Sequence, residues 1–194
     1  MRQAKDAVLR GLLWASALVS IGVLLLIVGF IFYKGIGYIS FDFIFGDYSP
    51  TGGGGILPMI VTTIYTIIIS LVIATPLGIL AAVYLQEYAK QGRLVNIIRF
   101  ATESLTGIPS IIYGLFGAVF FVATLKLGMS ILAASLTLTI IVLPVIIRTT
   151  EEALKTVPQS YREGSLALGT TKLQTLYKVI LPSAMPGILS GIIL

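Results

Sequence analysis

Residues able to perform catalysis are scarce in this sequence of 194 residues. It contains no histidine and no cysteine, so the commonest general base, the commonest metal ligand and every thiol nucleophile are missing. The long apolar segments contain no pair of carboxylates that could replace them. We therefore expect no catalytic residue, no metal site and no cofactor, and the chemistry left to consider is binding.

Arg148 is a candidate for anion binding, because its planar guanidinium matches the oxygen atoms of phosphate. It ends an apolar segment, so the alternative is that it anchors this segment at a membrane surface by snorkelling. Glu151 and Glu152 follow closely and could pair with it instead. We predict that Arg148 is a contact in a substrate pathway.

A second candidate for anion binding is TGIPSIIYGLFG, Thr106–Gly117. Gly107 and Pro109 predict a break in a helix here. Interrupted helices often form transport sites, because their free backbone amides can bind an anion without a fixed charge. Ser110 and Tyr113 would add hydroxyl groups, so we predict them as further pathway residues. A helix kink with close packing at the glycines is the alternative.

Long apolar segments position these candidates. Hydrophobic residues make up 57% of the chain and charged residues only 11%, with a mean hydropathy of +1.02, which indicates a protein that spans a bilayer. A crossing helix needs about 20 apolar residues. We predict an all-α, polytopic helical membrane protein with five apolar segments: Gly11–Tyr33, Ile56–Tyr84, Ile108–Leu125, Gly128–Ile147 and Leu181–Leu194.

The first and last segments need separate interpretation. Gly11–Tyr33 is too long for a signal peptide and no A-x-A cleavage site follows it, so we predict a retained helix. Leu181–Leu194 is too short to cross, and its Pro182 and Pro186 suit a helix N-terminus. We therefore expect the sequence to be a fragment whose last helix continues further.

The distribution of basic residues predicts the orientation. Of the 13 Lys and Arg residues, only Lys34 and Lys126 fall on one side of the predicted spans. The positive-inside rule then places the N-terminus and the loops 86–106 and 148–180 in the cytoplasm. The net charge of +5 follows from this asymmetry, so we expect the lipid bilayer and no nucleic acid as a partner. TGGGG, Thr51–Gly55, would be an external linker or a contact with an external binding protein.

The loop between Arg148 and Ile180 is amphipathic and interrupted. Three helix-start patterns lie in it: Thr149-x-x-Glu152, Ser160-x-x-Glu163 and Thr171-x-x-Gln174. Pro158 should interrupt the first helix, and Gly169 should close the second. Such short helices are marginal alone. The loop must therefore pack on its own spans, on the membrane surface or in the groove of a soluble partner.

Spacing separates these alternatives. Glu163-Gly164-Ser165, three residues, Gly169, nine residues and then Val179-Ile180-Leu181-Pro182 resembles E-A-A-x3-G-x9-I-x-L-P, the EAA motif of ABC importer permeases. Gly164 and Ser165 stand where the motif has alanines, and Val179 stands where it has isoleucine. TGIPSIIYGLFG, EYAKQGRLVNIIRFATESL and RTTEEALKTVPQSYREGSLALG further resemble the PstA-type permease of the phosphate-specific ABC transporter. The PstC-type partner permease is the alternative, because it shares the IPS-x-x-YG element.

The resemblance implies a type I ABC importer permease fold, in which the permease and the ATP-binding subunit are separate chains. Residues 1–55 would form an N-terminal transmembrane helix and external loop, and residues 56–194 the permease core. A coupling loop at about 149–180 would dock on a separate cytoplasmic ATP-binding subunit. Its contact residues would be Glu163, Ala167, Leu168, Gly169 and Thr170. Further partners would be a second, PstC-like permease subunit and an extracytoplasmic phosphate-binding protein, at the cell membrane of a prokaryote.

The resemblance therefore predicts a transport subunit that moves inorganic phosphate inward by alternating access, with ATP hydrolysis on its partner. Importers of other oxyanions couple the permease to an ATP-binding subunit in the same way, so a permease for another oxyanion is one alternative. A membrane-embedded enzyme lacks the residues it would need. A helical channel or membrane scaffold, whose loop packs only on its own helices, is the alternative outside transport by an ABC system.

Overall fold

The computed structural model describes residues 2–49 and 54–193, and every regular element in these ranges is helical. This confirms the all-α prediction. The chain forms two compact units, residues 1–61 and 62–194. Four helical stretches of the described residues are long and apolar enough to cross a bilayer: Leu9–Tyr38, Leu57–Tyr88, Ile131–Thr156 and Lys172–Ile193. A fifth arises if one bent helix pair is a single span.

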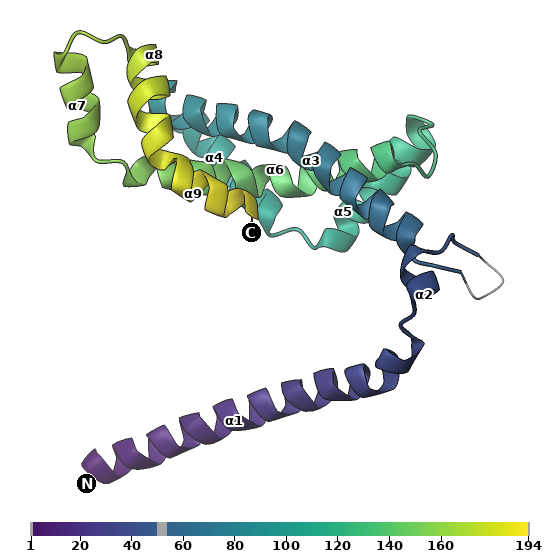
Figure 1. The fold of residues 1–194 in the computed structure, drawn as a ribbon. Helices are drawn as coiled ribbons and strands as arrows, with labels where there is room; N and C mark the ends of the chain where they lie inside the picture. The colour runs from purple at the N-terminus through teal and green to yellow at the C-terminus, as the bar shows by residue number, and fades with distance from the viewer. Residues whose placement is uncertain (1, 50–53, 194) are drawn as a thin grey trace. The chain divides into compact units, whose positions relative to one another are not determined.

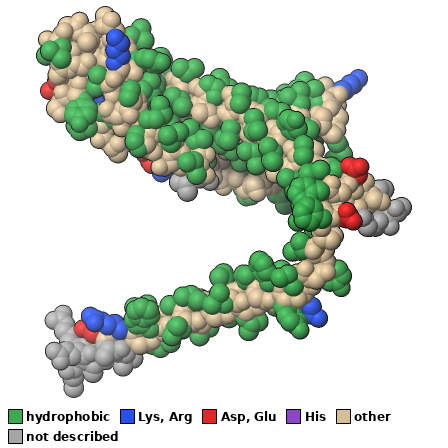
Figure 2. Space-filling view, in the orientation of Figure 1, with side chains coloured by type: hydrophobic (Ala, Val, Ile, Leu, Met, Phe, Trp, Pro, Cys, Tyr) green, Lys and Arg blue, Asp and Glu red, His purple; other side chains and the backbone are tan. Residues whose placement is uncertain are grey.

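The first unit is dominated by helix α1, Arg2–Gly35, which is followed by the 3-10 turn η1, Ile36–Tyr38, and the short helix α2, Phe41–Phe45 (Figure 1). The predicted span Gly11–Tyr33 lies wholly inside α1. Figure 2 shows hydrophobic side chains along this rod, with charged ones at its two ends. No residue of its most apolar stretch is buried within the described chain. Its surface is therefore suited to lipid or to another membrane helix.

The glycine-rich stretch after α2 closes a loop. Gly55 donates its N–H to the Asp47 carbonyl at 2.8 Å, and Ile56 donates to the Phe43 carbonyl at 2.9 Å. A Cβ on Gly55 would overlap the Gly46 carbonyl. Gly54 and Gly55 thus lie where backbone segments approach too closely for a side chain, and the role of TGGGG as a linker or as a contact with an external binding protein stays a prediction. Thr51–Gly53 lie outside the described residues.

The second unit is built around α6, Ile131–Thr156, which packs against α4, α5 and α9. Helix α3, Leu57–Val83, continues through the π turn η2, Tyr84–Tyr88, and joins α6 through a hydrogen bond from Ser70 Oγ to the Ser135 carbonyl at 3.0 Å. Small residues allow the helices to approach closely, as expected in membranes. The glycines whose added Cβ would press on a neighbouring helix are Gly78, Gly117, Gly187 and Gly191.

The third predicted span, Ile108–Leu125, needs correction. Its residues form α5, Ser110–Gly117, and the π helix η3, Ala118–Thr124, which are eight and seven residues long. Their combined rise of roughly 22 Å is shorter than the hydrocarbon core of about 30 Å. They pass as a span only together with α4, Arg93–Thr106, and the two parts bend by 95°. The break predicted at Gly107 and Pro109 is thus confirmed and is a sharp corner.

The helix starts predicted around the loop are confirmed in part. No helix begins at Thr149, because α6 continues through it and its hydroxyl donates to the Val145 carbonyl. Ser160 lies inside α7, Gln159–Ala167, rather than at its cap. Pro158 does interrupt the helical structure and separates α6 from α7. Thr171 caps α8, Lys172–Thr175, with both bonds of the capping box to Gln174. The coupling loop predicted at 149–180 thus begins with the end of α6.

The last helix begins earlier than predicted. Helix α8 continues through the π turn η4, Leu176–Ile180, into α9, Leu181–Ile193, so that Lys172–Ile193 is one helical stretch. Pro182 is therefore inside a helix and not at its start. The π turn accommodates it, because the Leu181 N–H bonds to the Leu176 carbonyl, five residues back. A proline has no N–H and crowds the carbonyl four residues before it, which for Pro182 is that of Lys178, inside the wider π turn.

Candidate functional site

Helices α7 and α8 form a hairpin at one end of the second unit (Figure 1). Its turn requires Gly169, whose φ of +83° lies in the left-handed region that favours glycine. The Gly169 N–H bonds to the Leu166 carbonyl at 2.9 Å and closes α7. Leu168 stands at the tip with 87% of its surface exposed. The predicted C-terminal glycine is confirmed, and the turn presents an apolar side chain to solvent.

Three hydroxyl groups hold the two arms of the hairpin together. Ser165 Oγ lies 2.8 Å from Thr170 Oγ1 and 3.1 Å from Thr175 Oγ1, and the two threonine hydroxyls are 2.8 Å apart. The Thr170 hydroxyl also donates to the Ser165 carbonyl at 2.8 Å. Ser165 and Thr175 are buried. Ser165, which departs from the alanine of the EAA pattern, therefore has a structural reason to be there.

The predicted coupling residues are brought together on this hairpin. Glu163, Ala167, Leu168 and Gly169 are exposed, while Thr170 is half-buried in the hydroxyl cluster. Within the described chain, no hydrogen bond or ion pair involves the Glu163 carboxylate. The arrangement offers a partner one carboxylate and one leucine on a rigid turn. Their role as contact residues stays a prediction.

The root of the hairpin is fixed by Arg162 of α7. Its Nη2 lies 2.8 Å from Oε1 of Glu87 in η2, and the two side chains are only 16% and 13% exposed. Nη1 donates to the Val157 carbonyl at 2.8 Å, and Nη2 to the Leu154 carbonyl at 3.0 Å. One guanidinium thus joins α7, the end of α6 and the end of α3. Because both residues are half-buried, removing one partner should cost less than the about 3–5 kcal/mol of a fully buried ion pair.

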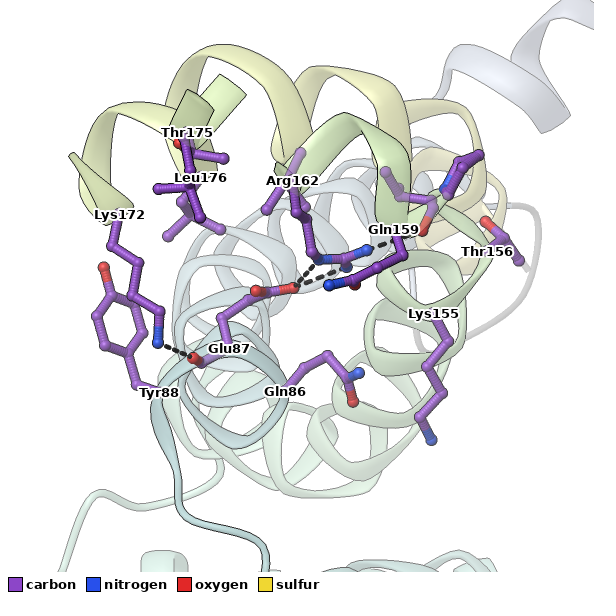
Figure 3. A pocket seen from close by; sticks show the side chains of 14 residues that line it. Gln86, Glu87, Tyr88, Lys155, Thr156, Gln159, Arg162, Lys172, Thr175 and Leu176 are labelled. Atoms are coloured by element: carbon purple, nitrogen blue, oxygen red, sulfur yellow. Dashed lines mark hydrogen bonds and ion pairs between the residues drawn. The ribbon is translucent and has the colours of Figure 1, made fainter. Parts of the chain in front are cut away.

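The sequence had signalled neither partner of this ion pair as functional. Glu87 entered only within EYAKQG and Arg162 only within RTTEEALKTVPQSYREGSLALG, two of the segments that carry the family resemblance. Figure 3 shows Glu87 and Arg162 pointing toward each other and in contact, and both line a cavity of about 580 Å³. Gln86, Lys155 and Gln159 also line it. The nearest signal in the sequence was that Glu87 and Arg162 have opposite charges and lie in segments that resemble the same family.

A second ion pair joins α4 to α6. Arg99 Nε lies 3.2 Å from Oε1 of Glu151, which is buried, and the guanidinium also donates to Gln91 Oε1 at 3.0 Å. Further bonds reach the Gln86 side chain and the Leu85 carbonyl at 3.4 and 3.5 Å. This network fixes the turn between α3 and α4 against the side of α6. Glu151 is therefore engaged by Arg99 and not by Arg148.

The predicted pathway residues lie apart from the hairpin. Arg148 Nε is 3.2 Å from Glu152 Oε1, and Arg148 Nη1 is 3.5 Å from Glu103 Oε1, so two carboxylates face its guanidinium. Ser110 is the exposed first residue of α5. Tyr113 is buried, and its hydroxyl donates to the Leu105 carbonyl at 2.8 Å across the corner. The place of these residues in a pathway stays a prediction, and Tyr113 has a structural role in the corner.

Comparison with known proteins agrees with this arrangement. Residues 74–194 match the family described as "Binding-protein-dependent transport system inner membrane component". YqgI of Bacillus subtilis, a "Probable ABC transporter permease protein", is 35% identical over 194 residues, which cover all of this chain and 66% of the relative. The "Phosphate transport system permease protein PstA 1" of Mycobacterium tuberculosis H37Rv is 41% identical over 141 residues, 73% of this chain and 46% of the relative.

A solved structure supports the same fold. An inward-facing structure of the MetNI methionine ABC transporter aligns with a TM-score of 0.58 and 27% identity, over 71% of this chain and 64% of that one. The chain spans about half to two thirds of the length of the proteins it matches. The family match over residues 74–194 includes the corner and the hairpin. The chain therefore belongs to the binding-protein-dependent transport system inner membrane components, the multi-pass permeases of ABC transporters.

Proposed function

We propose that this chain is part of the permease subunit of an ATP-driven importer, and that its α7–α8 hairpin is the coupling element. The observation that carries this proposal is the combination of an exposed tip with a buried root. Leu168 and Glu163 are presented to solvent, whereas Arg162 is bonded to the ends of both α6 and α3. A hairpin that only packed on its own helices would bury its apolar tip.

The partner that fits is a soluble ATP-binding subunit. An exposed leucine beside a carboxylate suits a shallow groove with a basic rim on that subunit. Closure of the ATPase on ATP would then carry the hairpin along as a rigid piece and bias the spans between two states. The further partners are a second permease subunit, of PstC type if this chain is of PstA type, and an extracytoplasmic binding protein.

The substrate we propose is inorganic phosphate. Support comes from the identity of about 40% to phosphate permeases over nearly three quarters of the chain. Arg148 and the Ser110 corner are the candidate contacts along the pathway. Arg148 would need to exchange at least one of its two carboxylate partners for the anion. A permease for another oxyanion uses the same hairpin, so the substrate must be tested directly.

The orientation belongs to the proposal too. The hairpin and the N-terminus lie on the side rich in Lys and Arg, which the positive-inside rule places in the cytoplasm. The turn before α6, which contains Lys126 and Gly128, then lies outside. Helix α6 has 26 residues and a rise of about 39 Å, enough to separate these two ends across a bilayer.

Site-directed cross-linking tests the coupling role. The chain has no cysteine, so Leu168→Cys supplies a single thiol. We expect this thiol to cross-link to the ATP-binding subunit with a yield that changes on addition of ATP. The matched control is Met129→Cys, which is 99% exposed at the other end of α6. Cross-linking of the Leu168→Cys thiol to this chain alone would favour the scaffold hypothesis.

Uptake of radiolabelled phosphate tests the substrate. Cells with and without the full-length gene are compared at low external phosphate, with excess sulfate or molybdate as competitors. We expect uptake to disappear on deletion and to resist both competitors. Unchanged phosphate uptake, with loss of another solute, would retain the permease and refute the substrate.

A further inference from the structure

We propose that Glu87, at the cytoplasmic end of α3, is the residue through which the hairpin moves the membrane helices. This inference rests on the proposed coupling role of the hairpin and specifies how movement leaves it. Glu87 contacts both arms of the hairpin, with its side chain on one and its backbone on the other. It is therefore a hub between the hairpin and α3.

The first link runs from the Glu87 side chain to α7. Its Oε1 accepts two bonds from Arg162, from Nη2 at 2.8 Å and from Nε at 3.3 Å. Both side chains are mostly buried, so water screens the pair weakly. Arginine's rigid donor geometry makes this link directional. A displacement of α7 must therefore either move Glu87 or break this half-buried ion pair.

The second link runs from the Glu87 backbone to α8. Lys172 Nζ donates to the Glu87 carbonyl at 3.2 Å, and the same ammonium lies 5.6 Å from the centre of the Tyr88 ring. Figure 3 shows Lys172 and Arg162 approaching η2 from separate helices. The two arms of the hairpin, which the hydroxyl cluster already holds together, thus converge on one residue of α3.

The third step concerns α3 itself. Glu87 lies in the π turn η2 that continues α3 without interruption, and Leu57–Tyr88 is one candidate span. A π turn inserted in a helix frequently occurs at a functional site. Farther along α3, Ser70 is bonded to α6. Movement of Glu87 is therefore delivered to a helix that extends across the membrane.

Apolar packing is the competing route. Val157, Leu176 and Ile180 belong to a buried cluster that also contains Val83 of α3. This cluster could carry the same movement without Glu87. The two routes differ in what breaks them, since the ion pair can be removed while the apolar cluster is left intact.

The experiment uses the complete transporter in proteoliposomes, with the full-length permease and its ATP-binding subunit. Phosphate uptake and ATP hydrolysis are measured on the same vesicles, and their ratio reports coupling. In the double variant Glu87→Cys/Arg162→Cys we expect hydrolysis to continue and the ratio to fall by about tenfold, within the usual range of coupling between sites. A bifunctional methanethiosulfonate reagent that bridges the two thiols should restore the ratio.

Three controls make the result decisive. A monofunctional methanethiosulfonate reagent, which fills the space without joining the helices, should not restore coupling. Lys90→Gln removes one exposed charge three residues after Glu87, and it should leave the ratio unchanged. The mass of the treated permease reports whether the bridge has formed.

The possible outcomes separate the two proposals. Wild-type vesicles that hydrolyse ATP but take up no phosphate would refute the substrate, and the ratio measured with the transported solute would then support or overturn the hub by the same criteria. Coupled uptake in the unbridged double variant would overturn the hub, as would restoration by the monofunctional reagent. A bridged permease that stays uncoupled, or thiols that cannot be bridged, would also overturn it.

Discussion

Substitution of Gly169 tests whether the hairpin turn needs a left-handed residue. Its φ is +83°, and a Cβ built on it meets no atom within 4 Å. In Gly169→Ala the cost is therefore conformational and not steric, at about 1–2 kcal/mol for an L-residue in this region. That energy corresponds to a roughly 5–30-fold rise in the population with an open turn. Gly169→Asn should cost less, because asparagine tolerates this conformation better.

The matched control is Gly164→Ala, five residues earlier in α7. Its Cβ also meets nothing within 4 Å, and the backbone there is helical. Alanine should stabilise this position by roughly 0.5–1 kcal/mol. The same chemical change is thus expected to have opposite effects at two nearby glycines of one hairpin.

Hydrogen exchange at the closing amides reports this difference. The N–H groups of Leu168 and Gly169 bond to carbonyls of α7 and are protected only while the turn is closed. Exchange is measured by mass spectrometry on the purified transporter and corrected for the intrinsic rate of each sequence. We expect protection to fall roughly 5–30-fold in Gly169→Ala and to hold or rise in Gly164→Ala. Equal protection in the two variants would refute the assignment of the turn.

Three further substitutions test other parts of the structure. Gly78→Ala should lower the melting temperature in detergent by several degrees, because the new Cβ would lie 2.6 Å from Ile146 Cγ2 and overpacking costs about 1–3 kcal/mol. The control Gly114→Ala places its Cβ in open space and should leave the melting temperature unchanged. Thr171→Ala should cost about 1 kcal/mol by removing the α8 cap, seen as faster exchange at the Gln174 amide. Arg148→Gln breaks only exposed ion pairs, so the free energy of unfolding should change by less than about 1 kcal/mol. Phosphate uptake should still fall roughly tenfold, because the guanidinium contact with the anion is lost. Normal uptake would remove Arg148 from the pathway.

The spans were predictable because the bilayer imposes a simple requirement. Backbone groups must be bonded within a helix, so the length of an apolar run nearly determines the element. That rule located Gly11–Tyr33 and Ile56–Tyr84 correctly. It failed at Ile108–Leu125, where Gly107 and Pro109 end the preceding helix and the stretch passes as a span only together with α4. A hydropathy profile does not reveal that two consecutive helices meet at 95°.

The helix caps were less predictable because a capping pattern is a local preference. At Thr171 nothing competes with it, since the left-handed Gly169 ends α7 and a new helix must begin. At Thr149 the pattern lies inside α6, where the buried faces of Thr150 and Leu154 favour continuation of the helix. Tertiary burial then exceeds the roughly 1 kcal/mol that a cap contributes. The same three-residue spacing is therefore a helix start at one site and part of a helix at the other.

The Arg162–Glu87 pair lies beyond any local pattern, because 75 residues separate its partners. Its position follows from three features that only the fold combines: the π turn at the end of α3, the break at Pro158, and the free carbonyl groups at the end of α6. Arg162 bonds to carbonyls of Leu154 and Val157 that the end of a helix leaves without an intrahelical partner. A lysine has only a compact ammonium and cannot reach these carbonyls and Glu87 with the same fixed geometry. An arginine at this position is therefore better explained by a joint between three elements than by a solvated surface charge.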